Sequence, residues 1–407
     1  MSPTNTNNAI STTRLLPLVM LSATLLLAAS AYAAAPGITR TGTTAGSFSL
    51  TAQANFISQP DGQLVYSCGY GCAAAPPAAA FNPPATKMPG ANCSSMQVPG
   101  PTLIVTEGQT VTVTLTNNLP PSAGNTSILF PGFQVTTSGG VAGLLTSEAA
   151  PGGAVTYTLT ASSVKPGTRS YYSGTQGDLQ VEMGLYGAII VLPNFSTNSA
   201  PLPFPSAGGC PQHNLQAEGQ LEQDFRLARA AYHVAGSCYD REYLFQFSEI
   251  DPKIHRQAEE QVTALGNCSL TPSTCKLNVA TEPYHPAYFM INGRSMPDDM
   301  DPHYAYQYPH QPYNGNPHMH PGELVLLRII GQGRWQHPFH EHGNHVRVLA
   351  RDGNLILSST PGATPSSPRA LAGPLLFTTT TTPGQAMDGI YYWSGKGLNP
   401  TSAVFRP

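Results

Sequence analysis

The stretch Thr102 to Thr116, TLIVTEGQTVTVTLT, alternates apolar and polar side chains on either side of a Glu-Gly turn. Alternate residues of a strand point to opposite faces, so a period of two indicates β-structure with a buried face. Gly153 to Thr160, GAVTYTLT, and Tyr186 to Leu192, YGAIIVL, follow the same pattern. These runs predict a hairpin at 102–116, further short strands and, for the fold class, an all-β sandwich.

The rest of the chain consists of similar short runs separated by 39 glycines and 39 prolines. Only Leu215 to Val234 has a helix-prone pattern, and it follows a Pro-, Ser- and Asn-rich piece that is typical of a linker. A second β region begins near Arg241 with REYLFQFSEI. We therefore predict a first β domain at 45–194, a linker with a short helical segment at 195–240 and a second β domain at 241–407.

Residues 1–33 have the composition of a signal peptide. Arg14 precedes the apolar run Leu15 to Ala29, and Ala31-Tyr32-Ala33 forms a small-x-small cleavage site. This pattern predicts an exported protein that is periplasmic or secreted. No later segment offers 18 consecutive apolar residues, so we expect no membrane span.

The charge of the chain argues against two classes of partner. The net charge is −3 and charged residues make up only 10% of the sequence. Nucleic acids and anionic membranes attract proteins with basic surfaces. We therefore expect neither nucleic acid nor a membrane surface as a partner.

Seven cysteines are consistent with disulfides in an exported chain, although the number is odd. Cys268 and Cys275 bracket a short loop, and Cys210 and Cys238 lie in another stretch. The other three cysteines lie close together in the sequence, at Cys68, Cys72 and Cys93. We expect local pairs and one leftover thiol. No cysteine follows Cys275, whereas a blue copper site needs a thiolate beside its histidines.

The string His-Pro-Phe-His-Glu-His-Gly at 337–343 places His337, His340 and His342 within seven residues. Neutral imidazole binds copper and zinc well, so this string predicts a metal site for copper, with zinc possible. His340 and His342 are two residues apart and should share a face of a strand. His337 can differ because Pro338 interrupts the ladder. His345, two residues beyond the glycine, is a possible further ligand.

Other residues have simpler interpretations. His303 and His310 lie in a Tyr/Pro-rich loop and are expected to face solvent. Met183 is expected to pack in a core rather than to bind a metal.

Several motifs occur in the order seen in multicopper oxidases, which this chain resembles over most of residues 95–355. The motifs are VPGPT at 98–102, NNLP at 117–120, GLYG at 184–187, FMING at 289–293 and HPFHEHG at 337–343. The last motif is specific, and the others are supportive. The resemblance implies two cupredoxin-like Greek-key β-sandwich domains. It also implies electron transfer from a donor through a type 1 copper to a trinuclear copper cluster that reduces oxygen to water.

The chain departs from the family at the first-domain copper ligands. Where the family has His-x-His after a Thr-Ser-Ile strand, this chain has Leu129 and Pro131. Where the family has Tyr-His-Ser-His, this chain has Tyr172 and Gly174 in place of the two histidines. The first domain therefore lacks its copper ligands, and the closing His-Cys-His motif of the family is absent as well.

The resemblance implies that His337 would bind the type 1 copper and that His340 and His342 would each bind a different copper of the cluster. Each of those metals needs ligands that the chain lacks, so we expect a single chain to be incomplete as an oxidase. Three explanations remain open: truncation, a partner chain or oligomer that supplies the missing ligands, and a fold kept for another task. The ending MDGIYYWSGKGL, 387–398, resembles the start of another hairpin and favours truncation.

Two functions from different classes therefore remain. One is a copper-binding oxidoreductase of the multicopper oxidase type, which oxidises phenols, aromatic amines or metal ions by single electrons and uses oxygen. The other is a non-catalytic envelope module that binds copper or zinc. Whether the protein is an enzyme stays open at this stage, as does the identity of any small-molecule or metal-ion electron donor.

Overall fold

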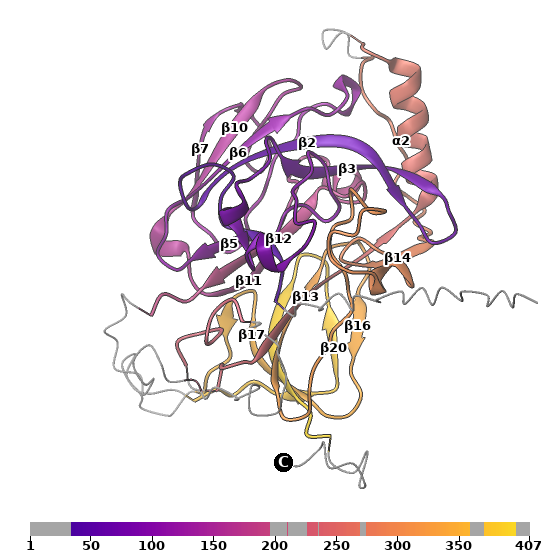
Figure 1. The fold of residues 1–407 in the computed structure, drawn as a ribbon. Coiled ribbons are helices and arrows are strands. Elements are labelled where there is room, and N and C mark those ends of the chain that lie inside the picture. Colours follow the sequence, from indigo (N-terminus) through magenta and orange to yellow (C-terminus); the bar gives the residue numbers. More distant parts are fainter. Residues whose placement is uncertain are drawn as a thin grey trace, which may run out of the picture. The chain divides into compact units, whose positions relative to one another are not determined.

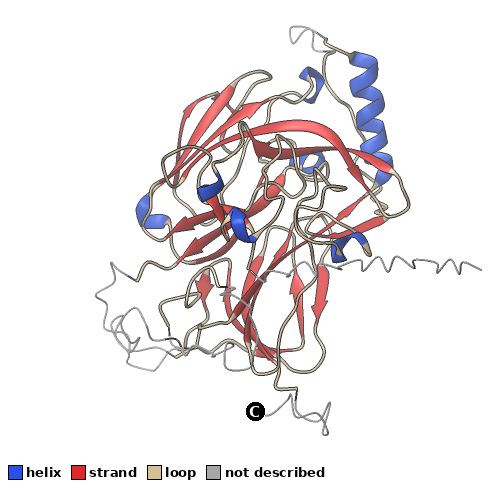
Figure 2. Cartoon of the chain, viewed as in Figure 1, coloured by secondary structure: helices blue, strands red, loops and turns tan. Residues whose placement is uncertain are grey.

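Strands dominate the computed structural model, which describes residues 34–195, 210, 226–234, 236–268, 274–358 and 370–395 (Figure 2). The predicted signal peptide, 1–33, lies outside the described residues, as does most of the predicted linker. Within residues 226–234 of the helix-prone segment the backbone forms bends and one β-bridge, Ala230 to Cys238, and no helix.

Two five-stranded sheets form the first region. One has the order β11-β12-β5-β1-β4, with bounds Gly167–Tyr172, Tyr186–Leu192, Leu103–Thr106, Gly37–Ile38 and Phe81–Asn82. The other has the order β3-β2-β6-β10-β7, with bounds Leu64–Cys72, Ser47–Ser58, Val111–Asn117, Ala154–Leu159 and Val135–Gly139. Both sheets contribute side chains to one apolar core, for example Leu103 and Ile189 from the first and Phe48 and Val113 from the second. The two sheets therefore form a sandwich.

The hairpin predicted at 102–116 is wrong, although both of its strands exist. β5 pairs in parallel with β1 and β12, while β6 pairs with β2 and β10 in the other sheet. Leu103, Ile104 and Val105 are all buried, whereas β6 alternates between buried and half-buried residues. Alternation predicts a strand but does not specify its partner, and a strand buried on both faces is typical of parallel pairing.

A seven-stranded sheet forms the second region (Figure 1). Its path is β14-β13-β15-β21-β17-β18, with β19 also on β17; the bounds are Tyr288–Ile291, Arg241–Ile250, Leu324–Gly331, Ala386–Tyr392, Val346–Arg351, Asn354–Leu355 and Leu375–Leu376. A two-stranded ribbon, β16 (His337–His340) with β20 (Thr378–Thr381), supplies Phe339 to the core on one face of this sheet. The other face packs Leu244 and Ile330 against Ala188 and Ile190 of β12. The larger sheet thus lies between the ribbon and the first region.

The remaining elements are short, except for one helix. A two-stranded piece joins β8 (Val141–Ala142) to β9 (Ser147–Glu148), and α1 is a single turn, Gly177–Gln180. Helical 3-10 turns occur at Ala78–Ala80, Ala85–Lys87, Pro121–Ala123, Ala161–Ser163 and Asp298–Met300. Among the described residues, none of the helices has the length and apolar composition needed to cross a membrane.

The helix α2, Pro252–Leu265, was not expected from the sequence pattern. Asp251 caps its start by accepting the N–H of Lys253 at 2.9 Å, and Pro252 occupies the first turn, where its missing N–H does no harm. Ile254 and Ala258, one turn apart, pack into the core of the first sandwich beside β3 (Figure 1). A chain segment from the second predicted domain therefore covers the first sandwich.

A buried polar network joins the two regions. Arg328 of β15 donates from Nε to Glu242 at 2.7 Å and from Nη1 to the hydroxyl of Thr168 in β11 at 2.9 Å. Asp388 of β21 accepts from the same hydroxyl at 2.6 Å. These side chains are at most 1% exposed. Buried charges are tolerated when they are paired and hydrogen-bonded, so this network ties β11 to the seven-stranded sheet.

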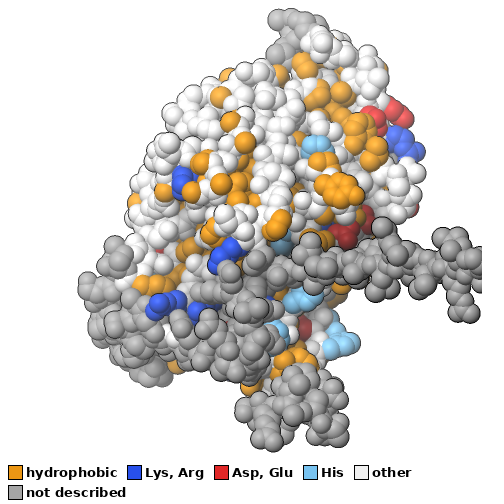
Figure 3. All heavy atoms as spheres, viewed as in Figure 1, with side chains coloured by type: hydrophobic (Ala, Val, Ile, Leu, Met, Phe, Trp, Pro, Cys, Tyr) orange, Lys and Arg blue, Asp and Glu red, His pale blue; other side chains and the backbone are white. Residues whose placement is uncertain are grey.

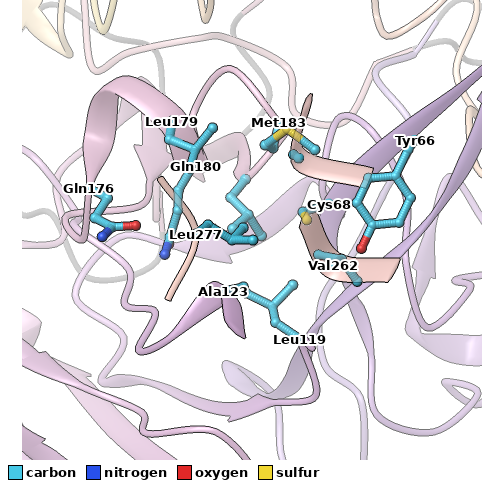
Figure 4. Close-up of a pocket in the computed structure, with 12 residues that line it drawn as sticks. Tyr66, Cys68, Leu119, Ala123, Gln176, Leu179, Gln180, Met183, Val262 and Leu277 are labelled. Carbon is cyan, nitrogen blue, oxygen red and sulfur yellow. The ribbon is translucent and has the colours of Figure 1, made fainter. Parts of the chain in front are cut away.

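The expected local disulfides are confirmed. Bonds join Cys72 to Cys93, Cys210 to Cys238 and Cys268 to Cys275, and Cys68 is the leftover thiol. Figure 4 shows the Cys68 thiol in a small pocket whose lining is mostly apolar, between β3 and α2. Burial raises the pKa of this thiol to about 12, so it is protonated at neutral pH.

Candidate metal centre

The string HPFHEHG begins on β16 and continues into the loop that leads to β17. Backbone pairing sets His337 opposite Thr381 and His340 opposite Thr378. Exposure alternates along β16: His337 and Phe339 are half-buried, while Pro338 and His340 are exposed. His337 therefore faces the seven-stranded sheet, and His340 lies on the outer face of the ribbon.

The imidazoles of His340 and His342 lie side by side, although β16 ends at His340 and His342 lies in the loop that follows rather than on the same strand face. Their ring centroids are 4.9 Å apart, with an interplanar angle of 80°, and both side chains are exposed. Nδ1 of His340 is hydrogen-bonded to the hydroxyl of Thr378 at 2.7 Å, which leaves its Nε2 available. Figure 3 shows histidine side chains at the surface in the part of the molecule where Figure 1 labels β16 and β20.

The loop after β16 is held by its backbone. The hydroxyl of Tyr391 donates to the carbonyl of His342 at 2.7 Å, and Gly343 has a φ of 97°, which a residue with a Cβ rarely adopts. Glu341 accepts the N–H of Val346, and burial raises the pKa of its carboxyl group. The loop therefore has a fixed path beneath the exposed imidazole of His342.

His345 is exposed, and its ring lies 5.5 Å from that of Phe377 between centroids. The ring of His340 lies 5.8 Å from the same phenylalanine. His345 is therefore near the pair through Phe377, and no contact joins its nitrogens to either imidazole among the described residues. Its role as a ligand stays a prediction.

His337 is held quite differently. Its Nε2 lies 2.6 Å from a carboxylate oxygen of Glu249, whose side chain is fully buried at the end of β13. The ring of Phe247 stacks on the imidazole with an interplanar angle of 25°, and the edge of Phe289 approaches it. Sequence reasoning missed Glu249. The signal was an acidic residue near the end of REYLFQFSEI, a run otherwise suited to a buried strand.

The first sandwich brings its resembling positions together without ligands. Leu129 and Tyr172 exchange two backbone hydrogen bonds, of 2.7 and 3.3 Å. A Cβ placed on Gly174 would lie 2.8 Å from Cγ of Leu129, so the leucine side chain occupies the space beside this glycine. These positions therefore lie side by side, and an aliphatic side chain fills the space between them.

These side chains can be compared with what copper requires. Among the residues that the structure describes, no group of three or more histidine, cysteine, aspartate or glutamate side chains is gathered in a way that would hold a metal ion. The exposed pair offers two imidazoles, which suit copper, and His337 is a separate third. The donor set fits a single copper at the pair and does not fit a trinuclear cluster.

Two expectations about other histidines are wrong. His303 is half-buried rather than solvent-facing, and its Nδ1 accepts the N–H of Asn314 at 3.0 Å. Burial, with Arg294 nearby, lowers its pKa to about 3. His310 is hydrogen-bonded to the carbonyl of Met96 at 2.8 Å. Proline-rich composition predicts a loop, but in this loop His303 and His310 are half-buried and hydrogen-bonded to the backbone. Met183 is buried, as expected.

Comparison with known family models gives a match within the first sandwich. Residues 85–195 match the family model described as "Multicopper oxidase". No curated protein sequence matches the chain. Copper is the metal that the family match implies, and nothing in it supports zinc.

Solved structures similar to this chain are distant in sequence. A multicopper oxidase, mgLAC, is 18% identical with a TM-score of 0.48, covering 84% of this chain and 74% of that chain. The blue copper oxidase from Nitrosomonas europaea is 18% identical with a TM-score of 0.47 over the same shares. The copper nitrite reductase from Nitrosomonas europaea is 15% identical with a TM-score of 0.47, covering 86% and 84%. Residues 85–195 thus match the multicopper oxidase family model, and the fold of the described residues is all-β.

Proposed function

We propose that this protein is an exported copper-binding redox protein of the multicopper oxidase type. Its copper is bound at HPFHEHG, with His340 and His342 as the primary ligands and His337 as a separate ligand position. The first sandwich serves as a scaffold without copper. The electron donor is a phenol, an aromatic amine or a low-valent metal ion, by resemblance to the family.

One observation carries this proposal: the exposed imidazoles of His340 and His342 lie 4.9 Å apart between ring centroids. Neither ring is enclosed by apolar packing, and the backbone beneath them is fixed by Tyr391 and Gly343. Structural histidines are usually buried with both nitrogens satisfied. Two adjacent exposed imidazoles on a fixed loop instead suit a divalent or monovalent copper ion.

The number of electrons limits the chemistry of the isolated chain. Copper supplies one electron at a time when it cycles between its two oxidation states, whereas oxygen needs four electrons to become water. The positions of the first sandwich that resemble ligands hold Leu129, Pro131, Tyr172 and Gly174, which offer no imidazole. Steady oxygen reduction therefore requires ligands from a partner chain or a second copy.

The test is copper binding by the purified full chain. After dialysis against Cu(II) and removal of loosely bound metal, we expect about one copper per chain by elemental analysis. Replacement of both primary ligands, His340→Ala with His342→Ala, should abolish this binding and leave the circular dichroism spectrum unchanged, because both side chains are exposed. His318→Ala, which removes another exposed histidine, is the matched control and should retain the copper. Copper retained by the double variant would overturn the proposal.

Oxygen uptake separates turnover from binding alone. A phenolic donor should reduce the copper of the loaded chain once, and the chain should then consume little oxygen. Steady uptake by the isolated chain would contradict the proposed limit of one copper. A chain that binds copper but is not reduced by any donor of these classes would be a binding module, and the redox part of the proposal would fail.

A further inference from the structure

The sheet β3-β2-β6-β10-β7 ends in two edge strands that differ in their neighbours. Along β3, the N–H of Cys72 donates to the carbonyl of Ser94, and the N–H of Cys68 donates to the carbonyl of Met183. Along β7, which lies beside β10, no backbone hydrogen bond joins residues 135–139 to any other described segment (Figure 1). Other parts of the chain therefore cover the β3 edge, whereas the β7 edge keeps its outward N–H and carbonyl groups unpaired among the described residues.

The sequence of β7 has none of the features that usually protect an edge strand. Natural edge strands carry lysine, proline, inward-pointing charges or bulges that prevent another strand from pairing with them. The strand reads VTTSG, it pairs with β10 in a regular register, and residues 131–147 around it contain no charged side chain. Thr136 to Gly139 are exposed. This edge is therefore able to pair with a further strand.

Exposed apolar side chains lie next to this edge. The hairpin of β8 and β9 follows β7 directly, and Val141, Leu144 and Leu145 in it are 43%, 93% and 64% exposed. The hydroxyl groups of Thr137 in β7 and Ser147 in β9 lie 2.8 Å apart and hold the hairpin against the strand. A group of exposed apolar side chains is typical of an interaction surface. We call the edge and the hairpin together, residues 135–147, the β7 surface.

The order of residues in β7 suits a second copy of the same chain. When two identical strands pair in antiparallel orientation about Thr137, each Thr137 faces the Thr137 of the other copy. Thr136 then faces Ser138, so hydroxyl groups meet hydroxyl groups across the pair. Two identical surfaces without charge do not repel each other, whereas a different protein is usually selected by complementary charges. The β7 surface therefore fits a second copy better than a different partner.

We propose that β7 is a dimerisation edge: two copies of this chain pair β7 with β7 in antiparallel orientation, about a two-fold axis at Thr137. Such an interface closes as a dimer, because both copies use the same surface. The exposed side chains of the β8/β9 hairpin contribute apolar contact with the partner copy. Because the paired edge is only five residues long, the dimer is weak and depends on concentration. This inference does not rest on the proposed function, since the β7 surface contains none of the proposed copper ligands.

Sedimentation velocity of the purified full chain, over a range of concentrations, measures the association. We expect monomers at low concentration and dimers at high concentration. Thr137→Lys should raise the dissociation constant about tenfold or more, because two like charges would meet at the axis. Thr43→Lys adds the same charge at another exposed threonine and should leave the dimer unchanged. A chain that stays monomeric at every concentration, or a dimer that Thr137→Lys leaves intact, would rule out the proposal.

A mixture of two charged variants tests the antiparallel arrangement. Thr137→Glu should be as monomeric as Thr137→Lys, for the same reason. An equimolar mixture of the two should form a heterodimer, because lysine then faces glutamate across the axis. A mixture that stays monomeric would show that the two positions do not face each other. Species larger than a dimer would contradict a closed two-fold interface.

Two further variants separate loss of the interface from loss of folding. Thr137→Ser keeps a hydroxyl group at the axis and should keep the dimer. Leu144→Ser combined with Leu145→Ser changes only exposed side chains, so it should weaken the dimer and leave the circular dichroism spectrum unchanged. A dissociation constant that does not change in this double variant would overturn the assignment of the hairpin to the interface.

Discussion

The first sandwich and the β16 ribbon differ at the positions that resemble copper ligands. In the first sandwich, Leu129 packs beside Gly174, and the positions that resemble copper ligands are closed by aliphatic contact. At the ribbon, His340 and His342 remain exposed and adjacent. The fold alone therefore does not preserve a metal centre, because its juxtapositions persist when the ligands are replaced by packing.

The architecture explains why the ribbon stays open. The first region has two five-stranded layers, each of which covers the other. In the second region a seven-stranded sheet is covered on one face by a described layer of only two strands. The outer face of β16 has no sheet above it among the described residues, and this face carries His340. Exposure of His340 thus follows from an uneven sandwich.

The largest expected effect concerns the network that joins the two regions. Arg328→Met should lower the free energy of unfolding by about 3–5 kcal/mol, because Glu242 and Asp388 would remain as buried charges without their cation. Urea unfolding followed by fluorescence measures the change. Lys165→Met, which removes a surface ion pair of 3.9 Å to Glu107, is the control and should cost less than 1 kcal/mol, roughly. Equal effects of both substitutions would show that the two regions do not depend on this network.

A smaller effect tests whether the first sandwich is closed by packing. Gly174→Ala should destabilise the protein by about 1–3 kcal/mol, since the new Cβ would lie 2.8 Å from Cγ of Leu129. Leu129→Ala in the same chain should recover part of that loss by giving the methyl group room. Gly177→Ala is the matched control, because a Cβ there meets nothing within 4 Å. If Gly174→Ala is neutral by thermal unfolding, the position is open and the contrast between the regions weakens.

The smallest expected effect concerns His303, a half-buried histidine of the second region. The pKa of His303 is lowered from 6.5 to about 3, chiefly by burial. Between these values the unfolded chain binds the proton and the folded chain does not. The contribution of His303 is therefore fully present above pH 6.5 and is lost as pH falls toward 3. When the pH falls from 7 to 5, the free energy of unfolding should decrease in both proteins. The decrease should be roughly 1–2 kcal/mol smaller in His303→Gln than in the unsubstituted protein. Identical pH dependence of urea unfolding in the two proteins would contradict this.

The sequence predicted strands better than it predicted their neighbours. Alternation at 102–116 located β5 and β6. Which strands each of them pairs with depends on contacts between residues that are far apart in the sequence. The helix α2 was missed even though Asp251 and Pro252 form a recognisable helix start, because its buried face contains only Ile254, His255 and Ala258. An apolar stripe that narrow gives a weak helical period.

The sequence likewise predicted some features of the candidate site and missed others. The spacing of His340 and His342 predicted one face of a strand; their rings are adjacent, but His342 lies in the loop after β16. The contact of Glu249 with His337 depends on β13 lying beside the turn at 333–335, which no local pattern encodes. His303 was misjudged because burial of a loop is a tertiary property.

We propose that this chain forms a histidine-based copper site without a blue centre or a copper cluster. The most direct measurement combines elemental analysis with the visible spectrum of the copper-loaded full chain. We expect about one copper per chain and no intense absorption near about 600 nm, because that band needs copper bound to a cysteine thiolate and the free thiol, Cys68, is protonated in the core of the first sandwich. A deep blue protein with about four coppers per chain would contradict the account.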